Sequence, residues 1–152
     1  MPFERSSSGG ASASGPAGRV DRDVFQSATL GATVRFCAYA PARFDPTRDG
    51  VLYLLHGLGN DETTWFAPGG GDLARVADAY YARRPEERRL AIAVDAGKCW
   101  YQNAYDGAWN YEDFFLDEFV PGIERRFGLG DMTSARRAIA GFSMGGYGAL
   151  LY

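Results

Sequence analysis

The stretch that decides the fold runs from Arg137 to Leu150 and reads R-A-I-A-G-F-S-M-G-G-Y-G-A-L. Its first part, Arg137–Ala140, is a short apolar run typical of a buried strand, and a helix is predicted to begin at Gly145. The pentapeptide between them, Gly141-Phe142-Ser143-Met144-Gly145, matches G-x-S-x-G. Glycines two positions before and after a serine permit a sharp, strained turn that projects the hydroxyl at a helix N-terminus. Ser143 is therefore the candidate nucleophile, with Gly141 and Gly145 as its supports.

Two other interpretations of this glycine-rich turn have to be weighed. It could be a plain strand-to-helix turn without chemistry, or a phosphate-binding loop. The sequence contains no G-x-x-x-x-G-K-[ST], and no G-x-G-x-x-G opens a helix after a strand. The strand–turn–helix context favours the nucleophile.

The rest of the chain alternates between strand and helix patterns. Short β-rich or apolar runs predict strands, and apolar residues at helical spacing predict helices, the last with Pro121 as a kink or a division into two turns. The predicted strands are Thr33–Tyr39, Val51–Leu55 and Leu90–Val94, and the predicted helices are Leu73–Arg84 and Tyr111–Phe127. This alternation predicts an α/β fold, a mostly parallel sheet with helices on both faces. It occupies residues 20–152 and follows a Ser/Gly/Ala-rich tail, residues 1–19, that is expected to be disordered.

A second loop carries candidate catalytic groups. His56-Gly57-Leu58-Gly59 directly follows the strand Val51–Leu55. In α/β-hydrolases such a loop supplies one backbone N–H to the oxyanion hole, and the residue after the nucleophile supplies the other. The expected donors are Leu58 and Met144, with the small Gly57 letting the loop lie near the reacting carbon.

His56 is the only histidine of the 152 residues. It could serve as the general base, or as a structural residue that orders the oxyanion loop. The α/β-hydrolase fold places the base after the nucleophile in chain order, which favours the structural interpretation.

Composition and charge exclude several classes of protein. The net charge of −3, with 46% hydrophobic and 23% charged residues, argues against a nucleic-acid-binding surface. No apolar run predicts a membrane span and no apolar leader is visible, so a cytoplasmic location is expected. Cys37 and Cys99 form neither a disulfide framework nor a metal-binding pattern and are expected to be free thiols.

The motifs together resemble the putative esterase family of α/β-hydrolases. The resemblance rests on Val51–Gly59, on Asp61-Glu62-Thr63-Thr64-Trp65 and on Gly141–Leu150, with support from Asp95-Ala96-Gly97 and Tyr111–Phe115. That family includes S-formylglutathione hydrolases, feruloyl and acetylxylan esterases, enterochelin-esterase-like proteins and mycolyltransferases.

The resemblance implies acyl transfer from a small-molecule ester to water through a serine ester, with no metal and no organic cofactor. It places Asp95, Trp100 and Tyr101 at the carboxyl edge of a strand, where ligands bind in such sheets. They line a substrate pocket there, or else Asp95 is a turn-forming carboxylate and Trp100 a core aromatic; both interpretations stay open.

The sequence departs from the family pattern after the elbow. The catalytic acid and histidine of the family follow the nucleophile on later strands, and neither is present here. A fragment of a longer esterase with little activity of its own is therefore expected, together with self-association through the exposed sheet edge at Arg137–Ala140. The alternatives are an acyltransferase of the same family and a non-catalytic binding module built on a degenerate hydrolase fold.

Overall fold

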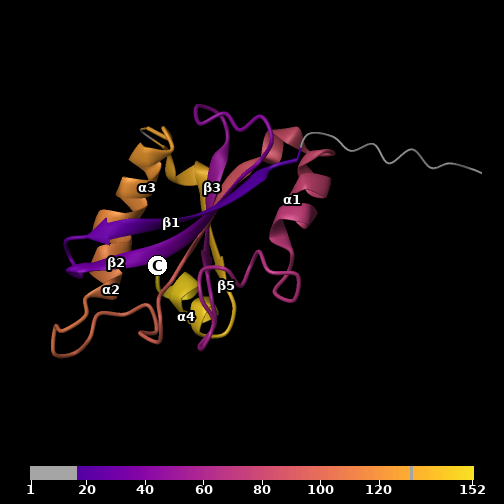
Figure 1. Cartoon of the computed structure of the whole chain (residues 1–152). Coiled ribbons are helices and arrows are strands. Elements are labelled where there is room, and N and C mark those ends of the chain that lie inside the picture. Colours follow the sequence, from indigo (N-terminus) through magenta and orange to yellow (C-terminus); the bar gives the residue numbers. More distant parts are fainter. Residues whose placement is uncertain (1–16, 131) are drawn as a thin grey trace, which may run out of the picture.

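The computed structural model describes residues 17–130 and 132–152 and contains one five-stranded sheet. Its order is β1-β2-β4-β3-β5 (Figure 1). The strands are β1 (Arg19–Ser27), β2 (Ala32–Ala40), β3 (Gly50–Leu55), β4 (Arg89–Val94) and β5 (Arg137–Gly141). The four strands predicted from the sequence are thereby found. Of the tail expected over residues 1–19, residues 1–16 lie outside the described residues.

The sheet is parallel at its centre and antiparallel at one side. β3 pairs in parallel with both β4 and β5. The hairpin β1–β2 joins through antiparallel pairing of β2 with β4, in which Phe36 lies opposite Val94. Parallel strands need crossover connections, and the intervening helices supply them. The carboxyl ends of β3, β4 and β5 therefore share one edge of the sheet.

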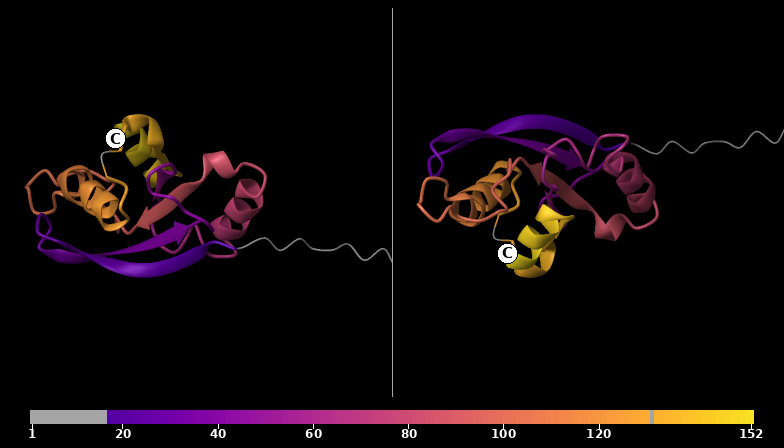
Figure 2. Two further views of the ribbon diagram at one scale, coloured as in Figure 1. Left: turned by 90° about the horizontal axis from the view of Figure 1, so that it is seen from above. Right: turned by 90° about the horizontal axis from the view of Figure 1, so that it is seen from below.

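Helices cover both faces of the sheet, as predicted. On one face, α1 (Leu73–Tyr81) packs on a small apolar cluster that includes Leu54 and Ala93. On the other face lies the main core, in which Tyr53 and Ile92 meet the helical segment 111–126 and Met144 of α4 (Met144–Leu151). Figures 1 and 2 show α1 and α3 on opposite sides of the central strands.

The helix predicted over Tyr111–Phe127 contains a π-helical stretch. It runs as α2 (Tyr111–Asp113), the π-helical segment η2 (Phe114–Phe119) and α3 (Val120–Arg126). The N–H of Val120 donates to the carbonyl of Phe115, five residues back. This wider turn lies directly before Pro121, which has no N–H to donate. The segment stays continuous, and Phe114, Phe115 and Phe119 are all buried.

Three short features complete the description. Two single 3₁₀ turns, η1 (Pro85–Glu87) and η3 (Ser134–Arg136), precede β4 and β5. None of the helices found in residues 17–130 and 132–152 has the length and apolar character that crossing a bilayer requires.

Candidate active site

Ser143 occupies a strained turn between β5 and α4. Its backbone angles are φ 53° and ψ −122°, a region that residues with a side chain rarely adopt. The serine is exposed, whereas Met144, the first residue of α4, is fully buried. The turn thus raises the hydroxyl above the carboxyl edge of the sheet at the N-terminus of a helix, where the free N–H groups favour negative charge.

The two glycines of the motif are required by contact with neighbouring backbone. A Cβ atom on Gly141 would overlap the carbonyl group of Gly145, and a Cβ atom on Gly145 would overlap the carbonyl group of Leu55. The elbow is therefore folded tightly on itself and seated against the end of β3. Any larger residue at either position would push Ser143 out of place.

The loop after β3 lies beside the elbow. A Cβ atom on Gly57 would come within 2.7 Å of the Phe142 ring, so only glycine permits this approach. The Asn60 N–H donates to the Gly57 carbonyl over 3.1 Å, closing a turn that leaves the Leu58 side chain about half exposed. On the far side of Phe142, the Trp65 ring packs edge-on with its centre 5.5 Å away. The two expected oxyanion donors, Leu58 and Met144, thus belong to neighbouring segments.

His56 is buried and both of its ring nitrogens contact backbone groups. Nδ1 lies 2.8 Å from the Gly57 carbonyl, and Nε2 accepts the Ala96 N–H over 2.9 Å. Because a carbonyl only accepts and an N–H only donates, Nδ1 carries the proton and the Nε2 lone pair is occupied. His56 thus links the oxyanion loop to the loop after β4 and has no nitrogen free for proton transfer.

Asp95 follows β4 and is held by three partners. Oδ1 accepts the Gly97 N–H over 2.9 Å and lies 3.6 Å from Nε2 of His56, and Oδ2 accepts from Arg35 over 2.6 Å. The His56 ring, the Gly97 N–H and the Arg35 guanidinium together lower the pKa of the Asp95 carboxyl, against the opposing effect of its burial. Asp95 is an ionised carboxylate that organises the sheet edge.

The structure corrects the sequence-based assignment of Tyr101 to a substrate pocket. Its side chain is fully buried, and its hydroxyl donates to the His56 carbonyl over 3.0 Å. A Cβ atom on Gly148 would lie 2.7 Å from the Tyr101 ring, so this ring supports α4 from below. Trp100, in contrast, is about half exposed and packs edge-on against Tyr147. Both residues have positive φ, which turns the chain sharply after β4.

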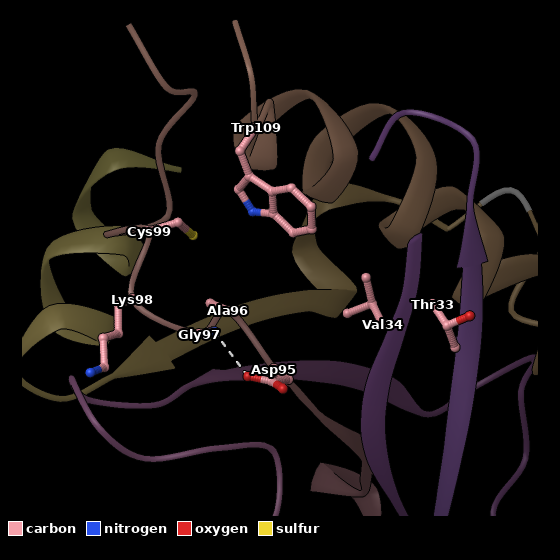
Figure 3. A pocket seen from close by; sticks show the side chains of 8 residues that line it. All are labelled: Thr33, Val34, Asp95, Ala96, Gly97, Lys98, Cys99 and Trp109. Carbon is pink, nitrogen blue, oxygen red and sulfur yellow. Dashed lines mark hydrogen bonds between the residues drawn. The ribbon is translucent and has the colours of Figure 1, made fainter. Parts of the chain in front are cut away.

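A shallow hollow of about 330 Å³ opens beside Asp95 (Figure 3). It is lined by the start of β2, the loop after β4 and Trp109. In Figure 3 the Cys99 thiol and the Trp109 ring face each other, while the Lys98 side chain points away. Burial raises the pKa of Cys99, so the thiol is not poised as a nucleophile.

Three residues at this edge were missed by the sequence analysis. Arg35 and Glu62 contact Asp95 and each other's surroundings, and Trp109 lines the hollow. Arg35 was counted only as a strand residue, Glu62 as part of a matching stretch and Trp109 as a generic aromatic. No local pattern could have paired them, because they meet only when distant strands align.

The site can stabilise negative charge on a bound carbonyl, but its proton acceptor is not among the described residues. Within residues 17–130 and 132–152, no group of three His, Cys, Asp or Glu side chains is arranged to hold a metal ion. An exposed serine at a helix N-terminus and a neighbouring glycine loop are the parts used in acyl transfer.

Comparison with known proteins agrees with this chemistry. A family model described as "Putative esterase" matches residues 27–152. Among curated proteins, an esterase of Mycobacterium tuberculosis is 38% identical over 111 residues, covering 67% of this chain and 21% of that protein. An endo-1,4-beta-xylanase/feruloyl esterase of Xylanibacter ruminicola is 28% identical over 138 residues, covering 85% of this chain and 19% of that protein.

Solved structures share the fold. A ferulic acid esterase superposes with a TM-score of 0.76 at 29% identity, covering 88% of this chain and 53% of that one. A fluorophosphonate-binding serine hydrolase of Staphylococcus aureus gives a TM-score of 0.69 at 25% identity, covering 88% and 50%. The S-formylglutathione hydrolase of Agrobacterium tumefaciens gives 0.70 at 21% identity, covering 88% and 52%. The fold is therefore that of the α/β-hydrolase esterases, and the chain spans about half the length of these structures and about a fifth of the curated relatives.

Proposed function

Because this chain belongs to the putative esterase family, we propose that it carries the nucleophile and oxyanion-binding part of a serine ester hydrolase. The single observation that carries the proposal is the conformation of Ser143, held at φ 53° on a turn that only glycines at 141 and 145 permit. A binding module has no use for such a strained turn, whereas a nucleophile needs its hydroxyl raised clear of the sheet.

In the proposed reaction, the Ser143 hydroxyl attacks the acyl carbonyl of a small-molecule ester. The negative oxygen that forms is held by the N–H groups of Leu58 and Met144, assisted by the N-terminus of α4. Collapse of this intermediate releases the alcohol and leaves an acyl group on Ser143, and water then attacks the acyl carbonyl and frees the acid.

Both steps need a base that takes the proton from Ser143 and later from water. His56 has no free nitrogen for that purpose, and it is the only histidine of the sequence. We infer that the general base and its acid partner come from residues outside these 152, as part of a longer esterase or from a second chain. The charge-holding half of the site is complete without them.

Labelling with a fluorophosphonate probe tests the nucleophile directly. The gene product that contains this chain is treated with the probe and digested, and the modified peptide is identified by mass spectrometry. We expect modification at Ser143 and its loss in Ser143→Ala. The matched control is Ser134→Ala, which removes another exposed serine from the same region and is expected to label like the unmodified protein.

Absence of labelling in a folded gene product would contradict the proposal and favour a non-catalytic binding module. If labelling occurs, hydrolysis of a small aryl ester with and without an added alcohol separates transfer to water from transfer to an alcohol. An ester product formed in preference to the free acid would replace the hydrolase with an acyltransferase.

A further inference from the structure

The carboxylate of Glu62 is buried at the junction of the oxyanion loop and the β1–β2 hairpin. Its side chain has no exposed surface, and Oε1 accepts from Nε of Arg22 over 2.7 Å. Nε of Arg35 lies 3.4 Å from the same oxygen. The other oxygen, Oε2, has no hydrogen-bond partner among the described residues.

Such an arrangement does not follow from stability alone. Burying a carboxylate is costly, and an ion pair in the interior often stabilises a fold no more than apolar residues of the same size would. Glu62 lacks a partner for one oxygen, which adds to the cost. A buried charge that is poorly repaid in stability favours a role in fixing one conformation of the segment that carries it.

The segment that carries Glu62 is the oxyanion loop. Glu62 is four residues beyond Leu58, and the chain between them is folded into two turns: the Asn60 N–H donates to Gly57, and Asp61 accepts from the N–H and the hydroxyl of Thr63. A force on Glu62 is therefore transmitted to Leu58 through a short, hydrogen-bonded path.

Arg35 connects this attachment to the other side of the loop. Its guanidinium faces Glu62 through Nε and donates to Asp95 through Nη2 over 2.6 Å. Asp95 precedes Ala96, whose N–H is bonded to His56 at the start of the loop. The loop is thus held at His56 by the β4 end and at Glu62 by the hairpin, and Arg35 touches both anchors.

We propose that Glu62, clamped by Arg22 and Arg35, is a positioning residue that holds the oxyanion loop at the distance from the elbow that the transition state requires. The proposal rests on the proposed function for its effect on turnover, while the attachment itself is a property of this loop alone. Oxyanion donors act only when fixed beforehand where charge develops, so loosening the loop lowers kcat rather than substrate affinity.

The test compares Glu62→Gln with Glu118→Gln in the full gene product. Glu118 is the matched control, because it also holds the hairpin with a carboxylate, accepting from the Ser27 hydroxyl and from the N–H groups of Ala28 and Thr29 at the β1–β2 turn. Amide hydrogen exchange is measured on the peptide covering residues 56–66 and on peptides from β3 and β4. Hydrolysis of 4-nitrophenyl acetate is measured alongside.

For Glu62→Gln we expect faster exchange in residues 56–66 with the strand peptides unchanged. We also expect kcat to fall by roughly tenfold, less than the loss of a whole oxyanion donor, with KM within about twofold. Arg22→Met should show a smaller effect of the same kind, because Arg35 remains. Glu118→Gln should leave both the exchange of residues 56–66 and kcat unchanged.

Unchanged exchange of residues 56–66 in Glu62→Gln overturns the proposal, as does faster exchange spread equally over the strands, which marks a role in general stability. A rise in KM at constant kcat also overturns it, since substrate contact would then be the cause. If the unmodified protein hydrolyses no ester, the proposed function fails by itself, and the exchange measurement still decides whether Glu62 holds the loop.

Discussion

Gly145 lies directly against the backbone of Leu55, so closely that a Cβ atom on the glycine would overlap the Leu55 carbonyl group and lie 2.8 Å from the His56 carbonyl oxygen. The contact joins the first turn of α4 to the last residue of β3. It sets the height of Ser143 above the sheet and its distance from the oxyanion loop. Several measurable consequences follow from this contact and from those around it.

Gly145→Ala should be strongly destabilising, by about 3 kcal/mol, because the added methyl group has only backbone to displace. Urea unfolding followed by circular dichroism measures the change. The control is Gly146→Ala in the same helix, whose Cβ atom would come no closer than 3.4 Å to any neighbour. We expect that variant to be neutral or more stable by up to about 1 kcal/mol. Equal destabilisation by both variants would contradict the assigned contact.

Ser143→Gly should be more stable than Ser143→Ala, by about 1 kcal/mol. Alanine retains the strain of φ 53° and ψ −122°, whereas glycine adopts these angles freely and offsets part of that gain through its more flexible unfolded state. Thermal melts of the two variants decide the matter. A glycine variant that melts below the alanine variant would show that the turn stores no strain.

Asp95→Asn should lose stability at neutral pH and lose progressively less as the pH falls. The pKa of Asp95 is lowered in the folded state, so its ionised form stabilises the fold above the ordinary Asp pKa of about 3.9. That contribution diminishes as the pH drops below about 4 and approaches the lowered pKa. Melting temperatures of both proteins at pH 3 to 7 should therefore converge towards acid. A constant difference over this range would remove Asp95 ionisation as the cause.

Arg137→Met should destabilise the elbow strand by roughly 2 kcal/mol, because it leaves the buried Glu124 carboxylate without its cation. Arg137 is the first residue of β5, and its Nε and Nη2 donate to the two oxygens of Glu124 over 2.6 and 2.7 Å. The double variant Arg137→Met with Glu124→Leu should recover most of the loss. Chemical denaturation of the single and double variants forms the test, and no recovery would mean that packing by the arginine stem dominates.

The sequence predicted the elements whose pattern is local. Apolar runs identified β3, β4 and β5, and the glycine spacing around Ser143 identified the elbow. Strand β1 was not predicted, because it lies at the sheet edge with mostly exposed residues and shows little alternation between Arg19 and Ser27. The π-helical turn before Pro121 could not be distinguished from a kink, since both satisfy the same missing N–H.

The site was predicted in part for the same reason. Ser143, Gly57 and His56 belong to short motifs, and the structure brings their segments together. Tyr101 was placed at a pocket because it follows a strand, but two successive residues with positive φ turn its ring into the core. The link from Glu62 to Arg22 and Arg35 joins residues on three segments and depends on the register of the hairpin, which no local pattern encodes.

The parallel pairing of β5 with β3 has a consequence for the order of folding. These strands are far apart in the chain, with β4 and all of the intervening helices between them, so their pairing closes a long loop late. The Ser143 turn gains its contact with Leu55 only at that moment. A chain that has collapsed but not yet docked β5 would carry a relaxed, unreactive serine, so appearance of fluorophosphonate reactivity during refolding would report the last event of assembly rather than the first.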